Sequence, residues 1–317
     1  MRVLFWGTPD FATPPLRALI GEGFDVVGVV TQPDRPVGRS RSTCRPSAVK
    51  VIAEEEGISV LQPERPRGEE FLDAIGRLQP DLSVVVAYGH ILPRAVIDLP
   101  PRGTINIHAS LLPKLRGAAP IQAAIRDGLA ETGVTIMRMV PALDAGPVIL
   151  QVPTPILEDE TYGELALRLS ELGALALVES LSLIELGSSL EFPQEEHLAT
   201  YAPKIERAMT RIDWTASARV VCRVIRAYDP RPGAISTLRG TEVKLFGART
   251  APVSSGSLPG EIVAIDDDGL TVACGEAAVR VAAVQPAGKR RMTPDDWARG
   301  RGVSIGERFG TNVVTTT

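Results

Sequence analysis

The first part of the chain alternates between short apolar runs and stretches with the features of helices. The apolar runs, which are rich in β-branched residues, lie at 3–6, 24–31, 58–61, 81–88 and 104–108. Runs of this kind are typical of strands buried in a parallel sheet. Helix-start and helix-stop residues frame the stretches at 13–21, 46–56, 69–78 and 119–127. This alternation predicts an α/β domain built from βαβ units.

Two more strands are predicted at 133–140 and 148–152, before the longest helix of the chain. That helix covers 162–186, and Thr161 begins a capping box at its start. Its apolar stripe indicates core packing. Gly187 ends the helix, and we place the end of the first domain there, at 1–187.

From residue 188 the pattern changes. Residues 188–205 are polar and aperiodic, and we interpret them as a linker between domains. The second domain is predicted over 206–317, with helices over 217–228 and 294–298. Between these helices lie five short runs separated by turn signals, at 234–238, 242–248, 260–265, 270–273 and 279–283. Five short strands predict a small OB-like β-barrel, a shape often used to bind nucleic acids.

The strand at 104–108 carries two kinds of side chain. Ile105 and Ile107 point to one face, and Asn106 and His108 point to the other, because successive strand residues alternate. The loop at 110–113 follows, and its proline cannot continue a central strand. Open α/β sheets bind ligands at strand ends. A lone polar residue there is usually structural, but two on one face beside an apolar loop favour a ligand site.

Composition narrows the chemistry. The 317 residues are 44% apolar and 23% charged, with a net charge of −4, as in an ordinary globular protein. The three cysteines are far apart and form no Cys-x-x-Cys motif, so we expect no structural zinc site and a reducing, cytoplasmic environment. We expect no signal peptide and no membrane span. A Gly-x-Gly-x-x-Gly motif is missing after the first predicted strand, which argues against a nicotinamide enzyme.

Two basic segments stand out in this acidic chain. The proline-containing stretch at 32–50 is predicted to be an irregular loop, and residues 289–291 form a second cluster. The basic residues of the two segments are Arg35, Arg39, Arg41, Arg45, Lys50, Lys289, Arg290 and Arg291. A solvated basic loop explains the first segment about as well as contact with the phosphates of an anionic macromolecule.

Asp144 lies in the connection between the two strands at 133–140 and 148–152. A turn is the commonest place for an aspartate, so its presence alone carries little information. Asp144 becomes a functional residue if this loop folds back over Asn106 and His108, because a carboxylate would then meet the imidazole.

Several segments match a known family in detail, among them Ile-Asn-Ile-His at 105–108 and Ser-Leu-Leu-Pro at 110–113. The others lie at 7–11, 31–36, 87–89, 91–93, 116–122, 131–136, 143–144, 211–214 and 285–289. Over nearly its whole length the chain resembles the methionyl-tRNA formyltransferases. The central segments alone indicate only an enzyme that uses 10-formyltetrahydrofolate, and the basic loop and barrel favour the tRNA family.

The resemblance implies a Rossmann-like formyltransferase domain followed by an OB-like tRNA-binding domain. It implies transfer of the formyl group of 10-formyltetrahydrofolate to the α-amine of initiator methionyl-tRNA, without a metal, by a monomer. The implied catalytic residues are Asn106, His108 and Asp144. The implied folate-binding residues are Tyr88, Gly89, His90, Ile91, Leu92, Ser110, Leu111, Leu112 and Pro113. The implied tRNA-binding residues are Arg35, Arg39, Arg41, Arg45, Lys289, Arg290 and Arg291.

Some positions depart from the family pattern, namely Ala145, His90, Arg231 and the Arg41-Ser42 pair. In the expected mechanism, Asn106 and a protonated His108 donate to the formyl oxygen, and Asp144 favours the charged imidazole and relays the proton of the amine. Two alternatives stay open. One is a folate-dependent formyltransferase that acts on an amino sugar nucleotide or a purine precursor, and the other is a non-catalytic RNA-binding protein.

Overall fold

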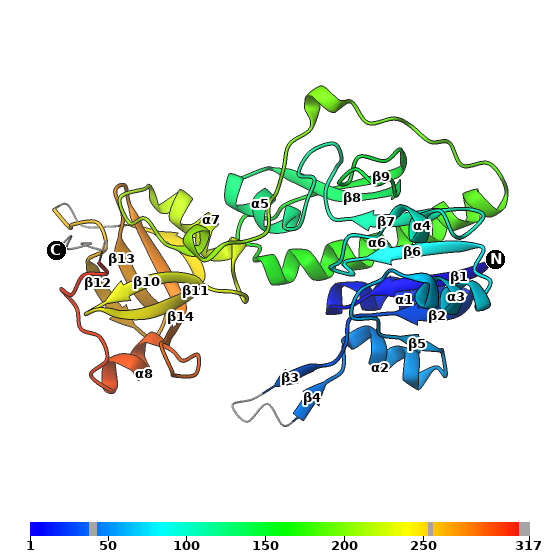
Figure 1. The fold of residues 1–317 in the computed structure, drawn as a ribbon. Helices are drawn as coiled ribbons and strands as arrows, with labels where there is room; N and C mark the ends of the chain where they lie inside the picture. The colour runs from blue at the N-terminus through cyan, green and yellow to red at the C-terminus, as the bar shows by residue number, and fades with distance from the viewer. Residues whose placement is uncertain (38–42, 253–255, 311–317) are drawn as a thin grey trace, which may run out of the picture. The chain divides into compact units, whose positions relative to one another are not determined.

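The computed structural model describes residues 1–37, 43–252 and 256–310 (Figure 1). The chain divides into two compact units. Unit 1 comprises Met1–Pro120, Glu131–Pro155 and Ala166–Pro203. Unit 2 comprises Ile121–Ala130, Ile156–Leu165 and the chain from Lys204 onward. None of the described helices is long and apolar enough to cross a membrane.

Unit 1 is built on a seven-stranded sheet with the order β5-β2-β1-β6-β7-β8-β9. The strands are β1 (Arg2–Gly7), β2 (Asp25–Val30), β5 (Val60–Leu61), β6 (Leu82–Val86), β7 (Thr104–His108), β8 (Glu131–Arg138) and β9 (Val148–Pro155). The first five pair in parallel, whereas β8 and β9 are antiparallel to their neighbours. The predicted α/β sheet is therefore confirmed.

Helices cover this sheet and connect its strands (Figure 1). They are α1 (Thr13–Gly21), α2 (Ala48–Glu55), α3 (Glu69–Arg77), α4 (Arg94–Ile97) and α6 (Tyr162–Glu185), whereas α5 (Pro120–Asp127) belongs almost entirely to unit 2. Five were predicted, and the short α4 was missed. All five residues of β6 are buried, which explains why four of them are apolar; the fifth, Ser83, accepts a hydrogen bond from the Trp6 indole.

The packing of α6 fixes which way β7 faces. A Cβ atom on Gly173 of α6 would lie 3.0 Å from Cγ2 of Ile107, so the helix backbone approaches this side of the strand closely. Ile105 and Ile107 are buried. The isoleucine face of β7 therefore contributes to the core, and the alternate residues Asn106 and His108 belong to the other face.

Unit 2 holds a five-stranded antiparallel sheet with the order β10-β11-β14-β13-β12. Its strands are β10 (Ala234–Leu238), β11 (Thr241–Ala251), β12 (Ile262–Asp266), β13 (Gly269–Ala273) and β14 (Ala278–Pro286). The five predicted strands are confirmed. Among the described residues no strand pairing joins β10 to β12, so the hydrogen-bonded sheet is open.

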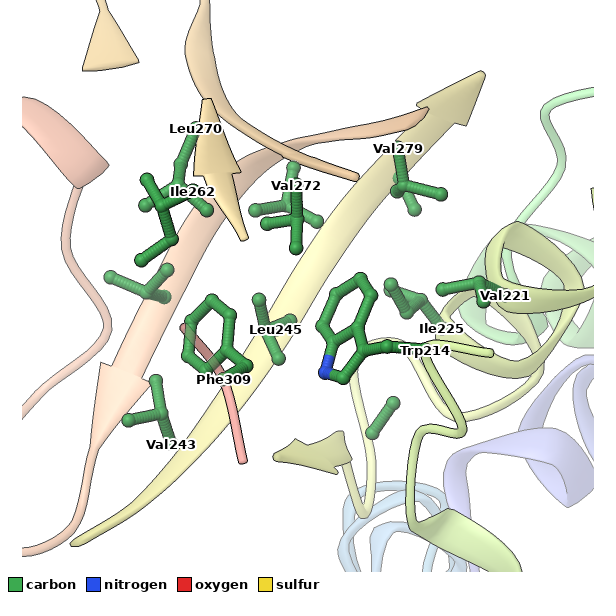
Figure 2. Packing of buried hydrophobic residues seen from close by; sticks show 14 of the residues in the cluster. Trp214, Val221, Ile225, Val243, Leu245, Ile262, Leu270, Val272, Val279 and Phe309 are labelled. Atoms are coloured by element: carbon green, nitrogen blue, oxygen red, sulfur yellow. The ribbon is translucent and has the colours of Figure 1, made fainter. Parts of the chain in front are cut away.

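The core of unit 2 lies between this sheet and α7 (Ala218–Ala227), and α8 (Pro294–Arg299) follows the last strand. Figure 2 shows side chains from four strands and α7 meeting around Leu245. The rings of Trp214 and Phe309 stack there, with centroids 5.5 Å apart. In sequence, Trp214 precedes the five strands and Phe309 follows them. Residues from both ends of the domain therefore pack in the same hydrophobic core.

The basic stretch at 32–50 differs from the expected irregular loop. Its ends form a two-stranded antiparallel sheet of β3 (Arg35–Val37) and β4 (Thr43–Arg45), in which Pro36 is opposite Cys44. Both strands are edges, so the missing N–H of the proline is tolerated there. Arg39 and Arg41 lie outside the described residues.

Candidate active site

The two polar residues of β7 occupy its carboxyl-terminal half. Asn106 lies opposite Val85 of β6 and Met137 of β8, and His108 lies opposite Thr135 of β8. The His108 side chain is almost fully buried, whereas Asn106 is half-buried. None of the hydrogen bonds recorded in the described chain uses the side-chain amide of Asn106. That amide is therefore available to a ligand.

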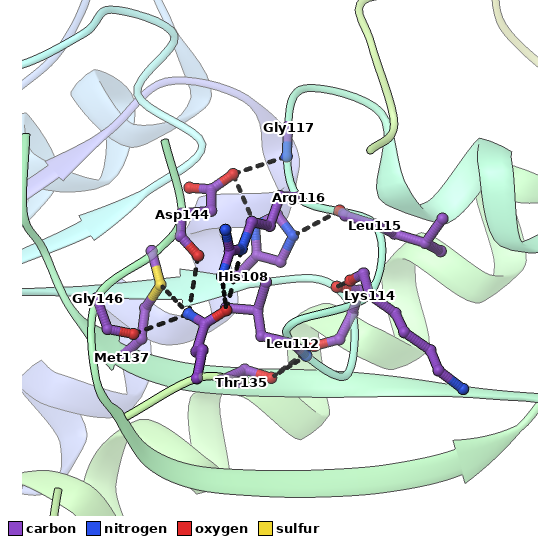
Figure 3. Close-up of polar contacts among 12 residues, drawn as sticks. His108, Leu112, Lys114, Leu115, Arg116, Gly117, Thr135, Met137, Asp144 and Gly146 are labelled. Atoms are coloured by element: carbon purple, nitrogen blue, oxygen red, sulfur yellow. Dashed lines mark hydrogen bonds and ion pairs between the residues drawn. The ribbon is translucent and has the colours of Figure 1, made fainter. Parts of the chain in front are cut away.

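Asp144 reaches His108 from the loop after β8 (Figure 3). Its Oδ2 atom lies 3.6 Å from Nδ1 of His108 and accepts a 2.7 Å hydrogen bond from the backbone N–H of Gly117. The loop thus folds back over the end of β7, which was the condition for a functional Asp144. Asp144 has a φ of 47°, in the left-handed region that aspartate tolerates better than most residues.

The partner of the other imidazole nitrogen, Nε2, indicates which tautomer His108 adopts. Nε2 of His108 lies 3.0 Å from the backbone oxygen of Leu115. A carbonyl oxygen can only accept, so Nε2 carries a hydrogen. Nδ1 then faces the carboxylate at a distance too long for a normal hydrogen bond.

Burial lowers the pKa of His108 below its ordinary value, although the charge of Asp144 and the Leu115 carbonyl act in the opposite direction. Water no longer solvates a charged imidazole at this depth, and desolvation is the largest of the three effects. A lowered pKa favours the neutral ring at pH 7. The expectation that a protonated His108 donates to the formyl oxygen considered the carboxylate and not the burial, and it stays a prediction about the reacting site.

The loop that follows β7 is fastened to the neighbouring strands. Thr135 of β8 donates to the Ser110 carbonyl at 2.6 Å and accepts from the Leu112 N–H at 3.1 Å. Gln151 of β9 donates to the Leu112 carbonyl at 2.7 Å. The Ser110 hydroxyl donates within the loop, to the Lys114 carbonyl at 2.6 Å. The predicted folate loop is therefore held firmly in shape.

The second predicted folate segment, after β6, divides into buried and exposed residues. Tyr88 and Leu92 are buried, whereas Gly89, His90 and Ile91 are exposed. The Tyr88 ring packs edge-on against Trp6, at 5.3 Å between centroids, and lies 5.6 Å from the His90 ring. Its hydroxyl is buried without a hydrogen-bond partner, and burial raises the pKa of Tyr88 to about 12.

The predicted tRNA-binding residues of unit 1 differ in whether their side chains already bind other residues of the protein. Arg35 donates to the side chain of Gln32. Arg45 is exposed at the end of β4. The neighbouring Lys50 pairs with Asp34 at 2.7 Å and so is already partly neutralised.

In unit 2 one residue of the basic cluster at 289–291 already binds other side chains of the protein. Arg291 pairs with Asp229 at 3.3 Å, and its guanidinium carbon lies 4.1 Å from the centre of the Phe246 ring. Lys289 and Arg290 are exposed, and none of the ion pairs recorded in the described chain involves them. These two residues are the ones whose charges remain available to an anionic partner.

Sequence reasoning missed the residues that support this site, above all Arg116 and Gln194. The Arg116 side chain is buried and donates to Gln194 and Glu196. Both acceptors lie in the stretch predicted as a linker, where no periodicity marks them. Within the ranges that the structure describes, no group of three or more His, Cys, Asp or Glu residues could hold a metal ion.

The fold and the site together define a class of protein. Residues 1–181 match the formyl transferase family, and residues 204–302 match the formyl transferase C-terminal domain. The chain belongs to the formyl transferase family.

Within that family, the chain is similar to proteins named methionyl-tRNA formyltransferase. It is 46% identical to that of Geobacillus thermodenitrificans over 313 residues, which are 98% of this chain and 98% of the relative. It is equally identical to that of Bacillus cereus, over 98% of this chain and 99% of the relative.

Solved structures share the fold. HypX from Aquifex aeolicus, in complex with tetrahydrofolic acid, superimposes with a TM-score of 0.67 at 22% identity. The match covers 95% of this chain, which spans about half of HypX (47%). The N-formyltransferase from Helicobacter canadensis, in complex with folinic acid and dTDP-3-aminofucose, gives 0.64 at 16% identity, over 92% of this chain and 99% of that one.

Proposed function

We propose that this chain transfers the formyl group of 10-formyltetrahydrofolate to the α-amine of initiator methionyl-tRNA, the reaction that gives N-formylmethionyl-tRNA for translation initiation. The observation that carries the proposal is the 46% identity to methionyl-tRNA formyltransferases over 98% of the chain. That match spans both the segment with Asn106, His108 and Asp144 and the C-terminal domain. The sugar formyltransferases resemble the chain only in fold, at under 20% identity.

The Asn106 amide is suited to the charge that develops in this reaction. When the amine attacks the formyl carbon, negative charge builds up on the formyl oxygen. An amide N–H that is aimed at this oxygen and has no partner in the protein stabilises the transition state more than the ground state. Because the Asn106 side chain is half-buried, its donor is also partly shielded from competing water.

The neutral His108 and Asp144 form the proton-accepting part of the site. The Nδ1 lone pair of His108 is free because the ring hydrogen is held on Nε2 by the Leu115 carbonyl. A proton lost by the attacking amine can be accepted by Nδ1 and then passed to N10 of the folate as the bond between N10 and the formyl carbon breaks. The imidazolium formed between these two transfers would lie 3.6 Å from the carboxylate of Asp144. Asp144 thus stabilises the charged ring during the reaction and not before it.

The folate would supply the activated formyl group, and residues of two loops would hold it. We assign this role to Ser110, Leu111, Leu112 and Pro113, together with Tyr88, Gly89, His90, Ile91 and Leu92. The fastened 110–113 loop supports the assignment, because a preformed wall binds a rigid ring with little loss of entropy.

We assign tRNA binding to the basic residues that are not committed elsewhere, Arg45, Lys289 and Arg290, together with Arg35, Arg39, Arg41 and Arg291. The open sheet of unit 2 with its single core is compatible with an OB-like barrel, which we keep as the proposed form of that domain. A tRNA substrate and three unpaired cysteines favour a cytoplasmic protein, and we propose that it acts as a monomer.

A direct comparison of acceptors tests the proposal. The purified chain is supplied with radiolabelled 10-formyltetrahydrofolate and either methionyl-tRNA or a dTDP-linked amino sugar. We expect label on the aminoacyl-tRNA alone. Transfer to the sugar with none to the tRNA would overturn the proposed substrate, and transfer to neither would overturn the proposed reaction.

A further inference from the structure

The stretch at 188–205 is more than a connection, because part of it is bound to unit 1. Phe192 exchanges two backbone hydrogen bonds with Val148 at the start of β9, at 2.8 and 2.9 Å. Further along, Arg116 donates its N–H to the Thr200 carbonyl at 2.8 Å and accepts from the Ala202 N–H at 2.7 Å. The chain between these two points is thus fixed at both ends against the loops that carry the site.

Gln194 lies between the two fixed points and turns inward. It is half-buried, whereas its neighbours Pro193 and Glu195 are exposed. Its Nε2 group donates to the backbone oxygens of Asp144 and Gly146, both at 2.8 Å. An amide nitrogen has two hydrogens, so each carbonyl can receive one.

The same amide also binds the loop that orients the imidazole. Oε1 of Gln194 accepts from Nε and Nη2 of Arg116, at 3.1 and 2.9 Å. The residues on either side of Arg116 contact the catalytic pair: the Leu115 carbonyl accepts from His108, and the Gly117 N–H donates to Asp144 (Figure 3). One side chain therefore joins the loop of Asp144 to the loop that holds both His108 and Asp144.

We propose that Gln194 is a positioning residue for the formyl transfer, which fixes the Asp144 carboxylate at its distance from His108. This inference rests on the proposed function of Asp144. The Asp144 backbone is in the left-handed region and its loop is exposed at 141–143. The Gly117 N–H holds the carboxylate, and the two hydrogen bonds from Gln194 hold the backbone of the same loop. Small displacements of catalytic groups reduce rates strongly.

The test compares three variants with the wild type in the methionyl-tRNA assay. Gln194→Met keeps the length of the side chain and removes its donors and acceptor. We expect kcat to fall on the order of 10- to 100-fold while the KM for the folate changes little. Glu196→Ala is the matched control, because Glu196 also binds Arg116 but does not contact Asp144 or Gly146. We expect it to keep kcat close to the wild-type value.

Gln194→Glu supplies a readout that a purely structural role would not change. Its carboxylate still accepts from Arg116, but it cannot donate to the two carbonyls until it is protonated. The ratio of its kcat to that of the wild type should therefore rise as the pH falls from 7 toward 5. A wild-type kcat in Gln194→Met, an equal loss in Glu196→Ala, or a ratio independent of pH would overturn the proposal. Inactive wild-type protein would instead contradict the proposed function.

Discussion

Oδ2 of Asp144 lies 3.6 Å from Nδ1 of His108, although His108 ends β7 and Asp144 lies in the loop between β8 and β9. The backbone N–H of Gly117 holds the same oxygen, and the Leu115 carbonyl holds the far side of the ring. The pair is therefore set by its surroundings and not by a direct hydrogen bond. This arrangement leaves the ring neutral and ready to accept a proton.

The neutral ring leads to a prediction about pH. The pKa of His108 should lie below about 6.5, the ordinary value for an unfolded chain. After correction for the protonation of the substrate α-amine, the kcat/KM for methionyl-tRNA should then stay constant from pH 7.5 to about 6.5 and decline only in more acidic solution. NMR titration of the ring measures the pKa directly. Asp144→Asn should lower it further, because the carboxylate charge raises it. A ring that titrates above 7 would contradict this account.

The same shift has a consequence for stability. The folded protein binds the His108 proton less readily than the unfolded chain does, so the unfolded state takes up more protons as the pH falls. The contribution of this residue to the free energy of unfolding is therefore present above about pH 6.5 and is lost below it. Denaturant unfolding of the wild type and of His108→Gln between pH 5 and 7.5 measures this. The gap in stability between the two should narrow toward pH 5.

Gly146 provides a test of the Asp144 loop. A Cβ atom at this position would lie 1.8 Å from the backbone oxygen of Arg138, so Gly146→Ala must displace the loop. We expect a loss of kcat on the order of 100-fold. Gly76→Ala in α3 is the control, because its Cβ would meet nothing within 4 Å. That change should keep full activity and stabilise the helix by up to about 1 kcal/mol. Similar activity in both variants would show that the loop tolerates displacement.

Thr135 should matter through the 110–113 loop. Thr135→Val keeps the shape of the side chain but removes the hydroxyl that bonds to Ser110 and Leu112. We expect a loss of about 1–3 kcal/mol in the free energy of unfolding, because buried backbone groups lose their partner. The KM for 10-formyltetrahydrofolate should rise more than the KM for methionyl-tRNA. An effect confined to the tRNA would place the folate elsewhere.

The three residues of the basic cluster at 289–291 should differ in role, two in tRNA binding and one in protein stability. Replacement of Lys289 and Arg290 by alanine should weaken tRNA binding and reduce the slope of its dependence on salt by about 2, roughly 1 per phosphate contact. Protein stability should not change. Arg291→Ala should instead lower the melting temperature, because Asp229 and Phe246 lose their partner. An unchanged salt dependence in the double variant would show that Lys289 and Arg290 do not contact the tRNA phosphates.

The sequence pattern predicted most of the elements because strand alternation and helix caps are local signals. It also identified Asn106 and His108, since their shared face follows from the two-residue period of β7. Three features depended on tertiary structure. The proline and arginines of β3 and β4 give a pattern typical of a loop, so the sequence does not predict this hairpin. The charge state of His108 depends on its burial. The role of Gln194 depends on contacts with loops about 50 and 80 residues away in sequence.

The role of the Asn106 amide is tested by a single-turnover measurement of formyl transfer to methionyl-tRNA, with wild type and Asn106→Ala. The Asn106 amide has no recorded protein partner in the described chain, so the variant should fold with an unchanged melting temperature and bind both substrates. We predict rapid transfer by the wild type and a rate on the order of 10²- to 10³-fold lower in Asn106→Ala, the usual effect of losing one donor to a developing oxyanion. Transfer at the wild-type rate in the variant would contradict the account.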